Sequence, residues 1–229
     1  MNSTRKAAVI AGVLFIIATV AGLSGTALAA IPTGADYLTQ LSAQASQVAA
    51  GALLHLIGYA ACVGIAVALY PVLIRWNAGL ALGSVLFRTL EAAFYMVGLA
   101  CVLSLLTLAQ QFTSAVAADR AALQAVGDAL QSVHNRAALL GVFAFCMGAF
   151  LYYYLFLQTR LIPRWLSGWG IVAVILMLAA CVLSLFSGNL ISSYIPLASQ
   201  IFLQEMVLAV WLIVKGFDPA VIAKGSESG

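Results

Sequence analysis

Residues 166–187 have the sequence LSGWGIVAVILMLAACVLSLFS, an apolar run that contains no charged side chain. A helix needs about 20 apolar residues to cross the hydrocarbon core of a bilayer, which is about 30 Å thick. A lipid-facing β-strand would alternate apolar and polar residues, and this run does not. Because lipid offers no partners to exposed backbone groups, the stretch predicts a transmembrane helix.

Five more blocks of this kind occur along the chain. The six predicted spans are residues 7–30, 48–74, 78–108, 137–157, 166–187 and 194–214. Of the 229 residues, 64% are hydrophobic and 7% are charged, whereas soluble domains carry roughly 25% charged residues. We therefore predict a single all-α domain, a bundle of six transmembrane helices, with residues 219–229 as a disordered tail.

Two of the predicted loops are long, and both lie on the side opposite the chain termini. Residues 32–47 are polar and small, with one charge, at Asp36. Residues 112–133 carry Leu123, Val126, Leu130 and Val133 at helical spacing among polar side chains. This pattern predicts a short amphipathic helix between the third and fourth spans, lying on the outer face as a lid over the bundle or as a ligand gate.

The distribution of Lys and Arg between the spans predicts the orientation. One side of the membrane receives Arg5, Lys6, Arg75, Arg160, Arg164, Lys215 and Lys224, and the other receives Arg120 and Arg136. Short loops rich in Lys and Arg stay in the cytoplasm. We therefore expect a multi-pass protein of the inner (plasma) membrane with both termini in the cytoplasm.

The first block also has features of a secretory signal. It follows the basic pair Arg5-Lys6 and contains Ala27-Leu28-Ala29, a small-x-small cleavage pattern. Its apolar run is longer than the core of a usual signal peptide, which favours a retained span.

Four segments carry a resemblance to a known family: RKAAVIAG (5–12), AVALYPVL (66–73), RLIPRWLSGWG (160–170) and LIVKGF (212–217). Together they make the chain similar to a bacterial family of small multi-pass membrane proteins, catalogued only as a domain of unknown function. The resemblance implies a bacterial inner-membrane protein. It supplies no catalytic residues and no activity.

Four ionisable residues fall inside the predicted spans: His55, Arg88, Glu91 and Glu205. At 1.5 Å of rise per residue, Glu205, Arg88 and Glu91 lie roughly 13–18 Å above the inner boundary, and His55 about 10 Å below the outer one. We therefore expect the four to meet near the midplane, where they form a candidate binding site. Arg88 and Glu91 are three residues apart and share a helix face, so we expect an ion pair.

This polar group has three interpretations. It is a binding or proton site, a buried network that only fixes the register of the helices, or a set in which Arg88 extends to the inner interface. Burial disfavours the charged form of Glu205 unless Arg88 or a protonated His55 lies beside it. Tyr152, Tyr153 and Tyr154, near an inner boundary, are interpreted as an aromatic belt.

The sequence predicts a small transporter or channel-like protein with a midplane polar site. The alternative is a non-catalytic accessory or assembly protein that binds lipid or a membrane partner. A membrane enzyme has the least support, because no catalytic motif occurs. Cys62, Cys101, Cys146 and Cys181 lack metal-ligand spacing and are interpreted as packing residues.

We expect no metal and no cofactor, a haem on His55 being the remaining alternative. The expected partner is the lipid bilayer. The candidate ligands are a proton, a small ion or an amphiphile. The net charge of +3 is too small to indicate nucleic acid as a partner.

Overall fold

The computed structural model describes residues 3–225, and this part of the chain is helical almost throughout. The helices are α1 (Ser3–Leu28), α2 (Tyr37–Ala43), α3 (Ala45–Leu73), α4 (Ala78–Ser114), α5 (Ala117–Thr159), α6 (Arg164–Ser187), the 3-10 turn η1 (Ile191–Tyr194), α7 (Ile195–Val214) and α8 (Pro219–Gly225). Six of them are long and apolar enough to cross a membrane. The predicted all-α bundle of six spanning helices is confirmed, and the chain is a multi-pass membrane protein.

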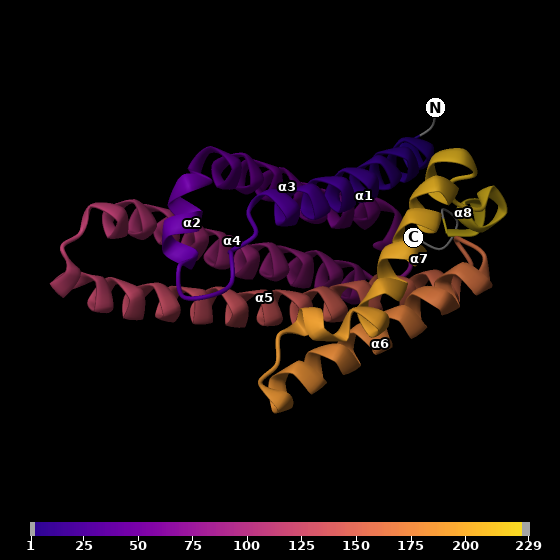
Figure 1. The fold of residues 1–229 in the computed structure, drawn as a ribbon. Coiled ribbons are helices and arrows are strands. Elements are labelled where there is room, and N and C mark those ends of the chain that lie inside the picture. The colour runs from indigo at the N-terminus through magenta and orange to yellow at the C-terminus, as the bar shows by residue number, and fades with distance from the viewer. Residues whose placement is uncertain (1–2, 226–229) are drawn as a thin grey trace.

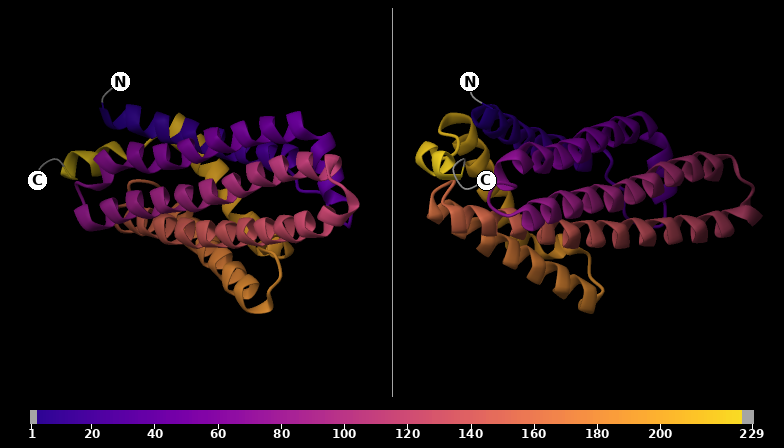
Figure 2. Two further views of the ribbon diagram at one scale, coloured as in Figure 1. Left: turned by 90° about the vertical axis from the view of Figure 1, so that its left-hand side faces the viewer. Right: turned by 180° about the vertical axis from the view of Figure 1, so that it is seen from behind.

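Consecutive long helices run in opposite directions, so the six spanning helices form an up-and-down bundle (Figure 1). The α4–α5 hairpin and the α1–α3 pair make the most extensive contacts, and α7 packs against both α1 and α6. In Figure 2, α6 slants away from the other helices toward its C-terminal end. Because consecutive long helices are antiparallel, one end of the bundle holds the start of α1 and the α3–α4, α5–α6 and α7–α8 connections.

The α4–α5 hairpin is longer than the sequence predicts. The predicted separate amphipathic helix within residues 112–133 is wrong, because α5 runs without a break from Ala117 to Thr159. Leu123 and Leu130 pack against a buried cluster, whereas Val126 and Val133 are exposed. The stretch is thus the first part of α5, paired with the last turns of α4 beyond the other helices (Figure 1).

The loop at residues 32–47 contains a helix that was not predicted. Tyr37, Leu38 and Leu41 of α2 are buried against α4 in a second core, separate from the main one. The Tyr37 hydroxyl donates a hydrogen bond to Asp128 Oδ1 of α5 at 3.0 Å. Seven residues are too few for a clear helical period, which is why the sequence alone indicates only a polar loop.

The C-terminal segment is also more ordered than predicted. Residues 219–225 form α8 rather than a disordered tail, and the Asp218 carboxylate accepts a hydrogen bond from the Ala220 amide at 2.9 Å. The rest of the predicted tail, residues 226–229, lies outside the described residues.

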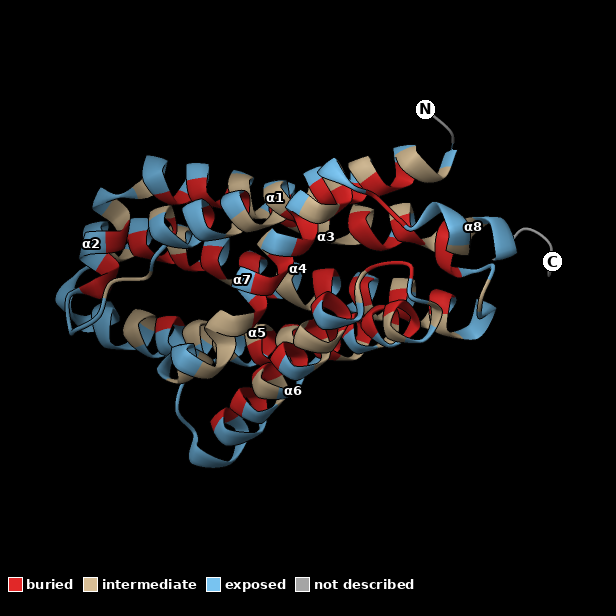
Figure 3. Cartoon of the chain, turned by 90° about the vertical axis from the view of Figure 1, so that its right-hand side faces the viewer, coloured by how far each residue is buried: buried red, intermediate tan, exposed pale blue. Residues whose placement is uncertain are grey.

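Small residues let the helices approach closely, as is usual where lipid provides no hydrophobic driving force between them. A Cβ atom on Gly12 of α1 would lie 2.7 Å from the Ala209 carbonyl oxygen of α7. The outward faces carry exposed apolar side chains such as Leu53 and Leu86, and the buried faces point inward (Figure 3). This is the inside-out pattern expected where lipid is the solvent.

Candidate functional site

Three of the four predicted residues meet inside the bundle. Arg88 and Glu91 project from α4 and Glu205 from α7, and their exposed fractions are 2%, 2% and 8%. Arg88 lies ten residues, or about 15 Å, from the start of α4, and Glu205 lies nine residues from the end of α7. The two helices therefore present these side chains at the same depth.

Arg88 and Glu91 form the predicted ion pair. The distance from Arg88 Nη1 to Glu91 Oε2 is 2.9 Å, and both side chains are almost fully buried. The guanidinium also lies over the ring of Phe145 from α5, with Cζ 4.9 Å from the ring centroid. Burial excludes the alternative in which Arg88 extends to the inner interface. An aromatic face and a carboxylate together replace the water that the guanidinium has lost.

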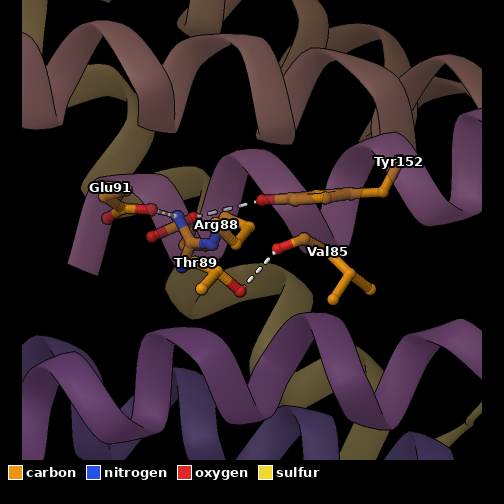
Figure 4. A network of polar contacts seen from close by, with 6 residues as sticks. Val85, Arg88, Thr89, Glu91 and Tyr152 are labelled. Atoms are coloured by element: carbon orange, nitrogen blue, oxygen red, sulfur yellow. Dashed lines mark hydrogen bonds and ion pairs between the residues drawn. The ribbon is translucent and has the colours of Figure 1, made fainter. Parts of the chain in front are cut away.

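Glu205 has a hydrogen-bond partner but no salt bridge within the described residues. The Tyr152 hydroxyl of α5 donates to Glu205 Oε1 at 3.4 Å, which is long for such a bond. In Figure 4 the Tyr152 hydroxyl is directed toward Arg88, with Glu91 on the other side of the guanidinium. The attraction of Arg88 extends to both carboxylates. We call Arg88, Glu91, Glu205 and Tyr152 the midplane cluster.

The aromatic-belt interpretation is wrong for two of the three tyrosines. Tyr152 and Tyr153 are fully buried, and only Tyr154 is exposed. The Tyr153 hydroxyl donates to Gln204 Oε1, and Gln204 Nε2 donates to the Leu166 carbonyl at 3.1 Å. This second series of hydrogen bonds lies beside the midplane cluster and reaches the first turn of α6.

The absence of a side chain at Gly170 leaves space for the Tyr153 ring of this hydrogen-bonded series. A Cβ atom at Gly170 of α6 would lie 2.5 Å from the ring of Tyr153, closer than real Cβ atoms approach. The ring of Tyr153 therefore occupies the space that a side chain at position 170 would need. The hydroxyls of Tyr152 and Tyr153, neighbours on α5, thus donate hydrogen bonds to Glu205 and Gln204, neighbours on α7.

The structure does not bring His55 into the midplane cluster. Its ring stacks on Tyr59 at 5.6 Å, and Tyr59 stacks on Tyr95 at 5.3 Å. Its electrostatic neighbour is His134 on α5, whose Nδ1 is 3.0 Å from the Gly98 carbonyl oxygen. The residue of α3 that interacts with Arg88 is not His55 but Cys62, which is seven residues, or about 10 Å, further along the helix.

Sequence reasoning also missed Cys62, interpreted only as a packing residue. Cys62 of α3 lies close enough to Arg88 for the two side chains to interact electrostatically. Its position seven residues after His55, which is about two helical turns, puts both on one face of α3. That spacing, and the adjacency of Gln204 to Glu205, were the available signals for a larger polar network.

The charges of the midplane cluster do not balance when all groups are ionised. One guanidinium faces two carboxylates, so the cluster is electrically neutral only when one carboxylate carries a proton. In a low-dielectric interior a net buried charge is strongly unfavourable. Since Glu91 is in contact with Arg88, Glu205 is the carboxylate in a position to hold that proton.

Two surface pockets lie away from this cluster. The first, of about 520 Å³, is formed by the α5–α6 and α7–α8 connections, and the second, of about 350 Å³, by α5 and the α6–η1 connection. Neither is lined by Arg88, Glu91 or Glu205. Among residues 3–225 no three His, Cys, Asp or Glu side chains come together as metal ligands.

Comparison with known proteins gives one match. Residues 10–216 match a family described as Domain of unknown function (DUF4386). No match was found among curated proteins or among solved structures. The match covers most of the chain and includes all of the midplane cluster, so this chain belongs to the DUF4386 family.

Proposed function

We propose that this chain is a small transporter that binds and releases a proton at Glu205 as part of its transport cycle. The observation that carries the proposal is the environment of Glu205, which is buried in mid-span with a tyrosine hydroxyl as partner while Arg88 is paired with Glu91. Ionisable residues inside membrane spans are costly, and they commonly mark ion or proton paths.

Opposing effects keep both protonation states of Glu205 accessible. Burial favours the protonated form, and so does the presence of Glu91, a second carboxylate that is already paired with Arg88. The Tyr152 hydroxyl and the attraction of Arg88 favour the carboxylate. A site at which neither form is strongly excluded can load and unload a proton reversibly.

Arg88 also has donor capacity to spare. Its Nε atom is buried and donates to none of the described residues. A buried donor without a partner is costly, so it is available to a small anion or to an acceptor atom at the polar end of an amphiphile that enters the cluster.

We further propose that the protein lies in the inner membrane with both termini in the cytoplasm. Support comes from the charges at one end of the bundle, where Arg75 and Arg160 lie in connections between spans, Arg164 begins α6 and Lys215 follows α7. Cytoplasmic loops are enriched in such residues.

The test is a comparison of the parent chain with Glu205→Gln, which keeps the shape of the side chain and removes its titration. Infrared difference spectra between acidic and alkaline buffer should show a protonated carboxyl band in the parent that is missing in the variant. Asp119→Asn, which removes an exposed carboxylate of α5, should keep the band. In liposomes that contain a trapped pH indicator, the parent should carry protons faster than Glu205→Gln.

A band unaffected by Glu205→Gln, together with equal proton flux in both proteins, would rule the proposal out. That result would favour the alternative function, an accessory protein whose polar network only fixes helix register. The distance of the two surface pockets from the cluster is the observation that favours this alternative.

A further inference from the structure

The larger surface pocket lies at the end of the bundle that carries the chain termini, far from the midplane cluster. Its volume is about 520 Å³, and it lies between the α5–α6 and α7–α8 connections. The Asp218 amide donates to the Leu161 carbonyl at 2.9 Å, which joins the two connections into one wall. The pocket is therefore built from two segments that are distant in sequence.

The charge of this pocket is positive. Its lining includes Arg160, Arg164 and Lys215 against a single acid, Asp218. All three cations are exposed, and none forms an ion pair within the described part of the chain. The Asp218 carboxylate accepts from the Ala220 amide at the start of α8, so part of its charge is already compensated.

The helix ends at the pocket, with the cations beside them, favour an anion. α6 begins at Arg164, and the N-terminal end of a helix carries a partial positive charge. The C-terminal end of α7 would contribute partial negative charge, but Arg5 donates to the carbonyl oxygens of Leu212 and Ile213 at 3.0 and 2.6 Å. Arg5 thus neutralises the partial negative charge at the C-terminal end of α7, and at the C-terminal end of α5 the residue in the C-cap position is itself a cation, Arg160.

The backbone at Arg160 is a second, independent observation. Arg160 has a φ of 62° and is the C-cap of α5, and it is the one described residue other than glycine with positive φ. Glycine adopts this conformation without the steric cost that a side chain pays. An arginine held here, with its side chain on the pocket, indicates a function for that side chain.

The surroundings of the pocket are apolar and aromatic. Trp211 lines it and packs edge-to-face against Trp165, with ring centroids 6.4 Å apart. Trp165 and Val214 are more than half exposed on the adjoining surfaces of α6 and α7. Tryptophan is enriched at the level of lipid headgroups. A ligand in this pocket would have its charge among the cations and its apolar part along these helices.

We propose that this pocket binds the phosphate headgroup of an anionic phospholipid. Basic pockets between spanning helices are a known form of headgroup recognition. The phosphate contacts Arg160, Arg164 and Lys215, and the acyl chains lie along α6 and α7. This proposal is independent of proton binding at Glu205, because the two sites share no residue.

The experiment uses the full chain purified in a non-ionic detergent, with phosphatidylglycerol as the probe and phosphatidylcholine as the zwitterionic control. Lipid adducts are counted by native mass spectrometry across a titration. Phosphatidylglycerol should bind more tightly than phosphatidylcholine. Arg164→Gln and Lys215→Gln should each weaken it about fivefold, the loss expected for one cation near an anionic headgroup. Arg75→Gln, an exposed cation at the same end but outside the pocket, should change nothing.

Arg160→Gly separates a binding role from a structural one. The substitution relieves the left-handed backbone, so the Tm should rise while the affinity for phosphatidylglycerol falls about fivefold. Lys215→Arg keeps the charge and should bind as the parent does.

Equal binding of the two lipids, or affinity unchanged in all three charge-removing variants, would overturn the site. Inorganic phosphate is added in a competing arm, and it should not displace the lipid. If it does so at equal concentration, the lipid assignment is wrong and the pocket takes a soluble phosphate instead.

Discussion

At the scale of single residues, the chain places one cation and two carboxylates in a space that excludes water. Arg88 satisfies Glu91 directly, and Glu205 depends on Tyr152 and on the more distant guanidinium. Arginine cannot neutralise itself by releasing a proton, whereas a carboxylate can neutralise itself by taking one up. The protonation of the whole cluster is therefore set by its two glutamates, and Arg88 is a fixed charge.

The Arg88–Glu91 pair should behave as one energetic unit. Arg88→Leu and Glu91→Leu each leave a buried charge without its partner, which costs about 3–5 kcal/mol. The double variant removes both charges together and should cost less than the sum of the single changes. Unfolding in detergent, followed by circular dichroism, measures the three values. Strict additivity would show that the pair does not interact.

The sequence predicted the ion pair and the depth of Glu205, but not the partners of Glu205. The spacing of Arg88 and Glu91 is a property of one helix, so periodicity is sufficient. Tyr152 and Tyr153 reach the cluster because of how α5 is rotated against α7, and a single sequence does not contain that rotation. His55 was placed with these residues for a different reason, because the estimate of its depth was too coarse to show that it lies about two turns from Cys62, the residue of α3 that is near Arg88.

At the scale of helices, length is the property that the sequence left uncertain. Polar residues such as Asp119, Arg120 and Asp128 lower the hydropathy of residues 117–133, so the predicted span began at 137. A helix does not have to end where lipid ends, and α4 and α5 support each other as a hairpin beyond the other helices. Helix α2 covers one side of this extension, because its residues Tyr37, Leu38 and Leu41 are buried in the same cluster as residues of α4.

The Tyr37–Asp128 hydrogen bond should link the stability of this extension to pH. Burial and the neighbouring Asp128 carboxylate raise the pKa of Tyr37 above its ordinary value. Tyr37→Phe should therefore lower stability by about 1 kcal/mol at neutral pH. Because the folded-state pKa is the higher one, the bond contributes fully below about pH 10. The contribution is lost as the pH rises through the folded-state pKa.

The measurement is the difference in Tm between the parent chain and Tyr37→Phe at neutral and at strongly alkaline pH. The difference should shrink in alkali. Tyr70→Phe is the matched control, because the Tyr70 hydroxyl makes no hydrogen bond with the described residues, and it should leave the Tm unchanged at both pH values. A difference that stays constant with pH would show that the hydroxyl of Tyr37 does not interact with Asp128.

At the scale of the whole molecule, two polar sites lie at different depths of one apolar bundle. The midplane cluster joins side chains from α4, α5 and α7, and the basic pocket joins the connections at one end. Composition was sufficient to predict the six spans, because uninterrupted apolar runs of about 20 residues are typical of transmembrane helices. The pocket was not predicted, since its two walls come from segments about 50 residues apart.

The orientation of the bundle is the prediction that connects both sites to the cell. A reporter that fluoresces only in the cytoplasm, and an enzyme that is active only after export, are fused at the same positions. Fusions after Arg75 and after Lys224 should fluoresce. Fusions at residue 115 or 116, in the connection between α4 and α5, should instead give the exported activity. The fusions avoid residues 117–133, because these residues lie within helix α5 and an insertion there would break it.

The expected result follows from the charge bias, with Arg75, Arg160, Arg164 and Lys215 at one end of the bundle. Fluorescence from the fusion at residue 115 or 116 would contradict the orientation, and the basic pocket would then face the outer leaflet.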